Sequence, residues 1–330
     1  MRRIVFAEPG RAVLETAPDP AVPADGALIQ TRYTCISAGT ELAKLDGRQD
    51  FPFPAPIGNR AVGRVLEVGP RCKQVQAGDL VFTHALHADP APSNALLAPL
   101  PPALDRPEAA LLGLGLVALT GLRVATPEIG DTAVVNGAGL VGQLLAQLLT
   151  LNGVRPIVVD PVAGRLAIAQ QCGAWQTATA GTDAVGQVRA LTDGRGAEHI
   201  FECSGVPAAA EQAVGFAAQS ANLVLVGSPR GAHRTDMTPF LNAFHLWRPD
   251  GDLRLMGAHE WKVPLYPVHG AKHSQARNLR TLAELAESGR LQLAPLLSRV
   301  FKPQDCQQAY DNLRRDRDTA LGAVFAWQDQ

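Results

Sequence analysis

The chain has 330 residues, which is enough for two domains with sizeable cores. Its 30 basic and 31 acidic residues give a formal net charge of −1, and the absence of a basic tail or stripe argues against nucleic-acid binding. The basic and apolar start at residues 1–6 is followed by Glu8 and Pro9-Gly10, so it ends too soon for a signal peptide.

The apolar stretch at residues 109–122 is interrupted by Gly113 and Gly115 and is too short to span a bilayer. The five cysteines are scattered and form no Cys-x-x-Cys pair, which is typical of reduced thiols in a reducing compartment. We therefore expect a cytoplasmic protein with no membrane partner.

The first hundred residues are predicted to form an all-β module. Short strands, separated by Pro and Gly, are expected at residues 12–15, 26–33, 63–69 and 79–82. No long helical period appears before residue 106, where Pro107-Glu108 opens a helix expected to run to residue 124.

From residue 133 onward, strands and helices are expected to alternate. Strands are predicted at residues 133–136, 155–160, 199–203, 222–227 and 253–257, and helices at 143–151, 162–172, 183–192 and 207–219. Alternation of this kind implies a parallel sheet with helices on both faces. A loop rich in His, Lys and aromatic residues follows, and then helices at 274–288 and 304–313 and a final strand at 322–327.

The segment at residues 133–160 matches a dinucleotide-binding βαβ unit: a β-branched run, a Gly-x-Gly-x-x-Gly turn, a helix and a strand ending in Asp. Gly137 allows the tight turn, Gly139 lets a pyrophosphate approach the backbone, and Gly142 lets the helix pack close to the strand. The diphosphate would sit on N–H groups at the helix N-terminus. Asp160 would accept hydrogen bonds from the adenosine ribose and repel a 2′-phosphate, which favours NAD(H) and leaves NADP(H) possible.

The order and spacing of several motifs resemble the medium-chain dehydrogenase/reductase superfamily, the zinc-type alcohol dehydrogenase-like proteins. The motifs are Gly39-Thr40-Glu41, residues 58–69, Gly78-Asp79, residues 113–115, 137–142, Asp160, 201–205 and 224–227. The resemblance covers nearly the whole chain and implies an α/β protein with two domains. A GroES-like β-barrel catalytic domain (residues 1–116 and 259–330) would be interrupted by a doubly wound Rossmann domain (residues 117–258). Substrate and nicotinamide would meet in the cleft between them.

The chain departs from the zinc-dependent members of this superfamily at every expected ligand position. Ala38 stands where they carry a cysteine, Asn59 where they carry a histidine, and Leu114 at or near the third ligand. Residues 84–100 also lack the cysteines of the structural zinc lobe. Because tetrahedral zinc needs at least three N, S or O donors, the sequence predicts a zinc-free member with no metal.

Without zinc, another group must stabilise charge on the substrate oxygen during hydride transfer. Thr40 stands where the resemblance implies a hydroxyl that relays the alcohol proton, although it could instead cap a turn. Arg60 could donate charge-assisted hydrogen bonds to an oxyanion or a carboxylate, or form a structural ion pair with Glu41.

The His-rich segments are a further source of catalytic candidates. Lys272 and His273 could line the substrate cleft and include a general acid or base, as could the other His and aromatic residues of these segments. Those others are His84, His87, His259, Trp261, Tyr266 and His269. Ordinary packing or surface roles, and a replacement metal site at His84 and His87, remain open alternatives.

The resemblance also extends the predicted cofactor site. It places Leu140 and Val141 with the three glycines at the pyrophosphate, and Arg165 near the adenosine ribose, where a solvated helix charge is the alternative. Ser204 and Gly227 would lie at the carboxyl ends of their strands, beside the nicotinamide half.

The predicted function is zinc-independent, NAD(P)-dependent hydride transfer between nicotinamide and a secondary alcohol or carbonyl. The turn Ser37-Ala38-Gly39-Thr40-Glu41 is similar to that of the bacteriochlorophyllide dehydrogenases, which suggests a substrate of specialised metabolism or a sugar-like one. Reduction of an activated C=C bond, as in quinone and enoyl reductases, is an alternative, and so is a catalytically inactive nucleotide-binding protein. By analogy with relatives that pair through an edge strand, we expect a homodimer.

Overall fold

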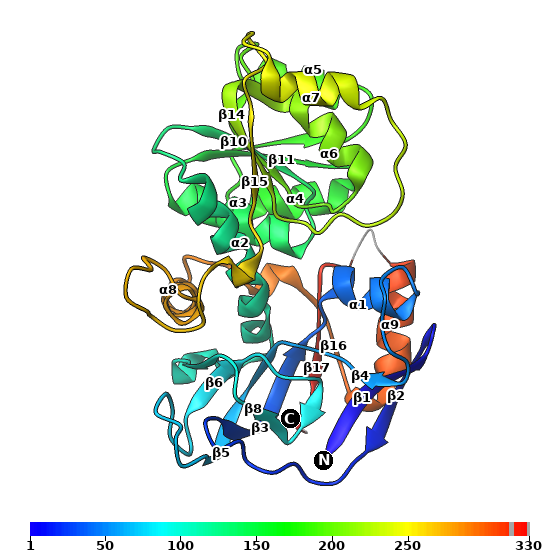
Figure 1. The fold of residues 1–330 in the computed structure, drawn as a ribbon, viewed down its shortest axis with the longest axis vertical. Helices are drawn as coiled ribbons and strands as arrows, with labels where there is room; N and C mark the ends of the chain where they lie inside the picture. The colour runs from blue at the N-terminus through cyan, green and yellow to red at the C-terminus, as the bar shows by residue number, and fades with distance from the viewer. Residues whose placement is uncertain (317–319, 329–330) are drawn as a thin grey trace. The chain divides into compact units, whose positions relative to one another are not determined.

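The computed structural model describes residues 1–316 and 320–328. The chain divides into two compact units, unit 1 (Met1–Leu116 and Val263–Gln330) and unit 2 (Val117–Lys262). In Figure 1, unit 1 runs from blue to cyan and from orange to red, and unit 2 is green to yellow. The chain returns to unit 1 after Lys262, whereas the sequence-based boundary was placed after residue 258.

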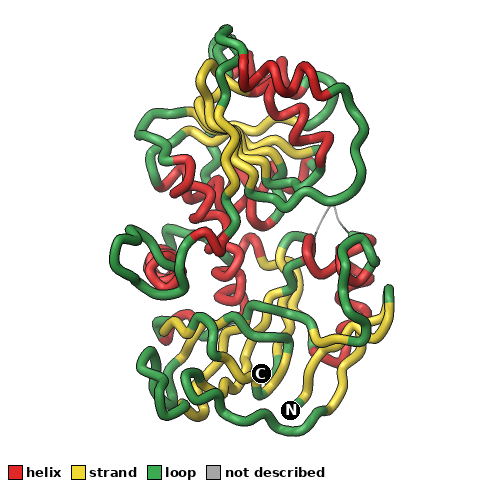
Figure 2. The backbone as a smooth tube through the Cα atoms, in the orientation of Figure 1, coloured by secondary structure: helices red, strands yellow, loops and turns green. Residues whose placement is uncertain are grey.

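Unit 2 contains a parallel sheet with the strand order β12-β11-β10-β13-β14-β15. Its strands are β10 (Thr132–Asn136), β11 (Arg155–Asp160), β12 (Gln176–Thr179), β13 (Ala197–Glu202), β14 (Ala217–Leu225) and β15 (Arg254–Gly257). Its helices are α3 (Leu140–Leu151), α4 (Ala163–Gln171), α5 (Ala184–Leu191), α6 (Pro207–Ala213) and α7 (Met237–His245). Helices lie on both sides of the strands (Figure 2), and the strand order reverses at β10, which confirms the predicted doubly wound fold.

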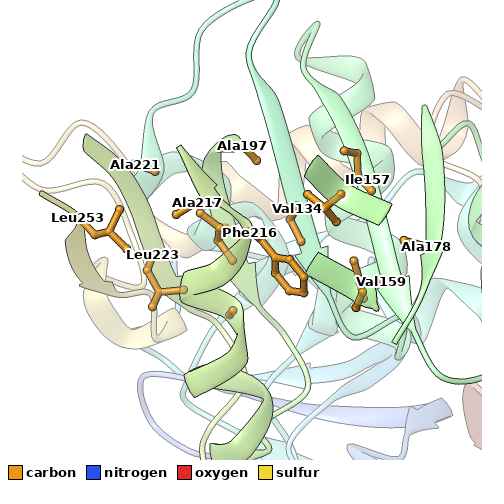
Figure 3. Close-up of a cluster of buried hydrophobic side chains, with 14 of the residues drawn as sticks. Val134, Ile157, Val159, Ala178, Ala197, Phe216, Ala217, Ala221, Leu223 and Leu253 are labelled. Carbon is orange, nitrogen blue, oxygen red and sulfur yellow. The ribbon is translucent and has the colours of Figure 1, made fainter. Parts of the chain in front are cut away.

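The core of unit 2 is apolar because its strands are buried on both faces. Val134 of β10, Ile157 and Val159 of β11, and Leu223 of β14 are at most 1% exposed. In Figure 3, the ring of Phe216 lies in the middle of this cluster. This core fixes the sheet whose carboxyl edge carries the predicted cofactor residues.

Two expectations about unit 2 are wrong. The helix predicted at residues 207–219 ends at Ala213, and β14 begins at Ala217, paired with Ala197 of β13. Burial of Phe216 and Ala217 in the core outweighs the helix propensity of the local sequence. Helix α7 was not anticipated, although Asp236 caps it by accepting a hydrogen bond from the Thr238 N–H.

Unit 1 contains two sheets among its described residues. One has the strand order β2-β1-β4 with β7 paired to β1, and the other β16-β17-β3-β5-β6-β9 with β8 paired to β3. The strands are β1 (Arg2–Glu8), β2 (Arg11–Thr16), β3 (Ala27–Cys35), β4 (Ala55–Pro56), β5 (Ala61–Val68), β6 (Leu80–Thr83), β7 (Ala88–Asp89), β8 (Ala91–Ser93), β9 (Leu97–Pro99), β16 (Leu297–Phe301) and β17 (Gly322–Ala326). Because β17 pairs with β3, the C-terminal segment completes a sheet begun near the N-terminus.

Helices also occur in unit 1, which corrects the prediction of an all-β start. Helix α1 (Ala38–Leu45) includes Thr40 and Glu41, which were expected in a turn. The further helices are α2 (Leu112–Ala125), which begins in unit 1 and ends in unit 2, α8 (Gln275–Glu287) and α9 (Cys306–Arg315). The short 3₁₀ helices of the chain are η1 (Pro102–Leu104), η2 (Pro107–Leu111), η3 (Val214–Phe216), η4 (Glu260–Lys262), η5 (Ala294–Leu296) and η6 (Pro303–Asp305).

The apolar stretch at residues 109–122, which is predicted to be too short to span a bilayer, lies within a longer helical run. The helical run Pro107–Ala125 has 19 residues, and it is long and apolar enough to cross a membrane. No other helix among the described residues meets both conditions. However, 72% of its apolar window is buried within the protein, as in the core helix of a globular domain. Its apolar character is therefore weak evidence for membrane insertion.

Candidate functional site

The glycine turn has the backbone geometry that its sequence predicts. Gly137 has φ +104°, and a Cβ there would lie 2.8 Å from the Ser204 nitrogen. A Cβ on Gly142 would lie 1.9 Å from the Gly137 carbonyl oxygen, so the first turn of α3 packs against the backbone of this loop. A Cβ on Gly139 would meet no described atom within 4 Å, so the backbone is open at this point.

The amino end of α3 follows directly on this open backbone. Gly139 is its N-cap and offers no capping side chain, and Leu140 and Val141 form the first helical positions. The N–H groups of a first helical turn have no partner within the helix, and the helix dipole makes this end positive. Such a helix end favours an anionic group, and the predicted diphosphate site at the N-terminus of α3 stays a prediction.

Asp160 ends β11 beside the glycine turn. One carboxylate oxygen, Oδ2, accepts the Ala138 N–H at 2.7 Å, and the other, Oδ1, accepts the Val162 N–H at 2.9 Å. The Arg165 guanidinium lies 3.9 Å from Oδ2. Asp160 is thus fixed in place and is 3% exposed, with the Arg165 guanidinium beside it.

The strand ends of β13 and β14 meet at the same edge of the sheet. Glu202 is fully buried and accepts the N–H groups of Ser204 and Gly205 at 2.9 and 3.0 Å, as well as the Ser204 hydroxyl. A Cβ on Gly227 would lie 2.7 Å from the Gly205 nitrogen, so these two loops pack backbone against backbone. Burial raises the pKa of Glu202, although the hydrogen bonds from Ser204 and Gly205 act in the opposite direction.

The structure also brings together the segments where the resemblance implied zinc ligands. The Cys35 N–H donates to the Arg60 carbonyl at 3.0 Å, and the Arg60 guanidinium donates to the Gly113 carbonyl at 2.7 Å. The three ligand positions, Ala38, Asn59 and Leu114, lie on these segments and carry no thiolate, imidazole or carboxylate. No group of three or more His, Cys, Asp or Glu residues placed to hold a metal is present in residues 1–316 and 320–328. The side chains at the three expected positions therefore do not supply the usual ligands of a tetrahedral zinc ion, and the absence of zinc stays a prediction.

Glu41, predicted as a catalytic candidate or a partner of Arg60, lies inside the core of unit 1. Its carboxylate accepts the Tyr310 hydroxyl at 2.7 Å and the Ser37 N–H at 2.8 Å, and lies 3.1 Å from Nε2 of His87. Glu41 is 2% exposed and His87 0%. These contacts occupy the Glu41 carboxylate and hold α1 in position, which favours a structural role, and its catalytic role stays a prediction.

The ionised form of Glu41 is favoured despite its burial. Burial alone would raise its pKa, but the charge and hydrogen bond of His87 and the hydrogen bonds from Tyr310 and Ser37 together lower it. Burial raises the pKa of Tyr310 well above its usual value, and the negative charge of Glu41 raises it further. Tyr310 therefore keeps its hydroxyl proton and donates a hydrogen bond to the Glu41 carboxylate.

Thr40 is next to Glu41 in the chain, and the Arg60 carbonyl accepts the N–H of Cys35, two residues before Ser37. Thr40 is half-buried in the first turn of α1, where its N–H donates to the Ser37 carbonyl at 3.0 Å. Ser37 is the N-cap of α1, and the relay and turn-capping roles of Thr40 both stay predictions. Arg60 is 3% exposed, and its donation to Gly113 fixes its side chain.

The candidate histidines are divided among separate contacts. His84 lies 3.1 Å from the Asn59 carbonyl and 2.7 Å from the Gln275 side-chain oxygen, whereas His87 contacts Glu41. The two therefore belong to different hydrogen-bond networks, which does not support a shared metal. Lys272 is exposed, and His273 is half-buried in the same loop, just before α8.

Comparison with known proteins supports the fold and the family. Residues 141–265 match the family model of zinc-binding dehydrogenases. The chain is similar to the D-guloside 3-dehydrogenase of Escherichia coli, with 26% identity over 94% of this chain and 95% of the relative. The chain is thus similar to dehydrogenases of the medium-chain dehydrogenase/reductase superfamily.

Several solved structures share the fold over almost the full length of the chain. Galactitol-1-phosphate dehydrogenase from Escherichia coli has a TM-score of 0.81 at 18% identity, covering 99% of this chain and 100% of that one. A mycobacterial quinone oxidoreductase has a TM-score of 0.81 at 23% identity, with the same coverage. Because a galactitol-1-phosphate dehydrogenase and a quinone oxidoreductase fit equally well, the fold alone does not show which type of reaction this chain would catalyse.

The match to the family model does not show whether this protein binds zinc. The matched residues, 141–265, do not include Ala38, Asn59 or Leu114, so the match does not test the positions where zinc ligands would stand. The sequence analysis assigns no role to the side chains of Glu202 and Tyr310, and it names His87 as a cleft or metal candidate and not as a partner of Glu41. His87 and Tyr310 lie far from Glu41 in the chain, but Glu202 stands two residues before Ser204, where its carboxylate could have been recognised as a loop-capping group.

Substitution Tyr310→Phe tests the Glu41 network. We expect the free energy of unfolding at pH 7 to fall by about 1.5–3 kcal/mol, because a buried charged acceptor loses a donor. The lowered pKa of Glu41 stabilises the fold above pH 4.5, and this stabilisation is lost as the pH falls through the lowered value. The difference between wild type and variant should therefore shrink in acid, which urea unfolding at several pH values measures.

The control for this experiment is Tyr33→Phe, which removes the hydroxyl of another buried tyrosine of unit 1 and leaves the contacts of Glu41 in place. An effect of Tyr310→Phe that does not change between neutral pH and acid would contradict the account.

Proposed function

We propose that the protein is a zinc-independent oxidoreductase that prefers NAD(H) and transfers a hydride between nicotinamide and a secondary alcohol or carbonyl. The observation that carries this proposal is the carboxylate of Asp160, fixed at the end of β11 by the N–H of Ala138 within the glycine turn. A carboxylate in this place accepts hydrogen bonds from ribose hydroxyls and repels a 2′-phosphate.

The residues of unit 1 are proposed to supply the proton chemistry. Bound nicotinamide would accept or release the hydride at its C4 carbon. The Thr40 hydroxyl, in the first turn of α1, is proposed to relay the proton: it accepts the proton of the substrate alcohol while it passes its own hydroxyl proton to water, and the relay runs in reverse when a carbonyl is reduced. Arg60 is proposed to stabilise negative charge on that oxygen, because a guanidinium forms charge-assisted hydrogen bonds without a metal.

We infer that the substrate is sugar-like. The D-guloside and galactitol-1-phosphate dehydrogenases to which the chain is similar are named for hydroxyl-rich substrates. A secondary alcohol in a polyol or glycoside presents the same CH–OH group for hydride transfer. Lys272 and His273 remain candidates for contacts with such hydroxyl groups, since both lie in a loop of unit 1.

The protein is also proposed to be a cytoplasmic homodimer. Strand β15 stands at the end of the parallel sheet in unit 2, and its residues are largely exposed, with Leu255 52% exposed. An exposed edge strand with an apolar side chain is suited to pairing with the same strand of a second copy.

Substitution Asp160→Asn tests the cofactor proposal. Removing the negative charge should bring the Kd values for NADH and NADPH at least tenfold closer, because the repulsion of the 2′-phosphate is lost; tenfold equals about 1.4 kcal/mol. Binding is followed by the fluorescence of the reduced nicotinamide. Asp160→Ala, which also removes the acceptors for two backbone N–H groups, should additionally lower the unfolding midpoint. An unchanged preference in both variants would refute the assigned role of Asp160.

Substitution Thr40→Val tests the proton relay. We expect kcat to fall by about a hundredfold or more, as is typical when a general acid–base group is removed. The Kd for NADH should stay unchanged, since the cofactor residues lie in unit 2. Thr40→Ser keeps the hydroxyl and should keep most of the activity. Equal kcat values for the Thr40→Val and Thr40→Ser variants would contradict the proton relay.

The choice of substrate tests the type of reaction. Turnover of quinones but not of polyols by the wild type would favour the alternative function, reduction of an activated C=C bond.

A further inference from the structure

Gln143 links the glycine turn to helix α4 from inside unit 2. It lies in α3, one turn after Gly139, and is 0% exposed. Its side-chain nitrogen donates to the Arg165 carbonyl at 2.8 Å and to the Ala138 carbonyl at 3.3 Å. An amide nitrogen carries two hydrogens, so this pair of acceptors uses its full donor capacity.

The surroundings of Gln143 also decide the orientation of its amide. Both groups that its nitrogen contacts are backbone carbonyls, which can only accept hydrogen bonds. A flipped amide would bring its oxygen against two other oxygens, so only the observed orientation is stable. The side-chain oxygen is buried without a partner among the described residues, a cost that the two donated bonds must offset.

These contacts close a ring around the place where the adenosine ribose is proposed to bind. The Ala138 peptide is held on both sides, its N–H by Asp160 and its carbonyl by Gln143. Gln143 also holds the backbone of Arg165, whose guanidinium lies 3.9 Å from the Asp160 carboxylate. The ring therefore runs from Asp160 through Ala138 and Gln143 to Arg165 and back to Asp160.

From this geometry, and building on the proposed NAD(H) preference, we propose that Gln143 is a positioning residue for discrimination between NAD(H) and NADP(H). It sets the separation between the carboxylate and the guanidinium that face the ribose. Accommodating a 2′-phosphate requires Asp160 to turn away and Arg165 to reach the added charge. The ring opposes both movements, because the Asp160 carboxylate and the Arg165 backbone are tied to the same glycine turn.

A purely structural role for Gln143 predicts a different change in ligand affinity when the residue is replaced. If Gln143 only stabilised the packing of α3, its loss would weaken every ligand of the site equally. If it positions Asp160 and Arg165, its loss should change the relative affinity for two ligands that differ only in the 2′-phosphate. Adenosine 5′-monophosphate and adenosine 2′,5′-bisphosphate form such a pair, and neither contains nicotinamide.

The experiment measures Kd for these two nucleotides by calorimetry, using the full-length wild type, Gln143→Leu and Gln143→Met. Both variants remove the donors at similar side-chain volume, and two are used in case one fails to fold. Gln147→Leu is the matched control, because Gln147 is a buried glutamine one turn further along the same helix. We expect wild type to bind the 5′-monophosphate more tightly, and the Gln143 variants to reduce this preference about tenfold, a change of about 1.4 kcal/mol. The control should keep the wild-type ratio.

A failure of the proposed NAD(H) preference and a failure of the proposed role of Gln143 give different results in this experiment. A wild type that prefers the 2′,5′-bisphosphate, or binds neither nucleotide, overturns the NAD(H) assignment and the inference with it. A wild type with the expected preference, combined with Gln143 variants that keep the same ratio, overturns the inference alone. The same result for Gln147→Leu as for the Gln143 variants would also overturn it.

Discussion

The cofactor half of the protein depends on one hydrogen bond between a buried carboxylate and a backbone N–H group. Asp160 ends one strand of the parallel sheet, and its acceptance of the Ala138 N–H ties that strand to the glycine turn of the preceding one. The glycines permit the turn, but they do not by themselves fix its position. The carboxylate does so, while remaining at the edge where strands of a doubly wound sheet bind ligands.

Two other loops of the molecule are also held by hydrogen bonds from backbone N–H groups to a buried carboxyl group. Glu202 accepts the N–H groups of the loop that follows its strand, and Glu41 accepts the N–H of Ser37 at the start of α1. In each case a buried carboxylate is stabilised by donors that also define a loop. Each of these loops is thus held by a buried carboxyl group that does not itself need to react.

The sequence is informative where the signal is local. The glycine turn and Asp160 lie within one βαβ unit, so their spacing predicts both the fold and the cofactor site. Contacts between distant segments are different, since Glu41 and Tyr310 are 269 positions apart and one sequence does not reveal that they meet. Helix α1 was missed because its eight residues are too few to show a helical period, and the helix expected at 207–219 was overextended because tertiary packing outweighs propensity.

The central claim is that hydride transfer proceeds here without zinc, with Thr40 and Arg60 in place of the metal. Its most direct test is the metal content of protein purified without chelator, measured by plasma mass spectrometry on a sample that binds NADH. The account predicts zinc far below one ion per chain, together with NADH binding that a chelator does not change. One zinc ion per chain, removed by a chelator with loss of turnover, would contradict it.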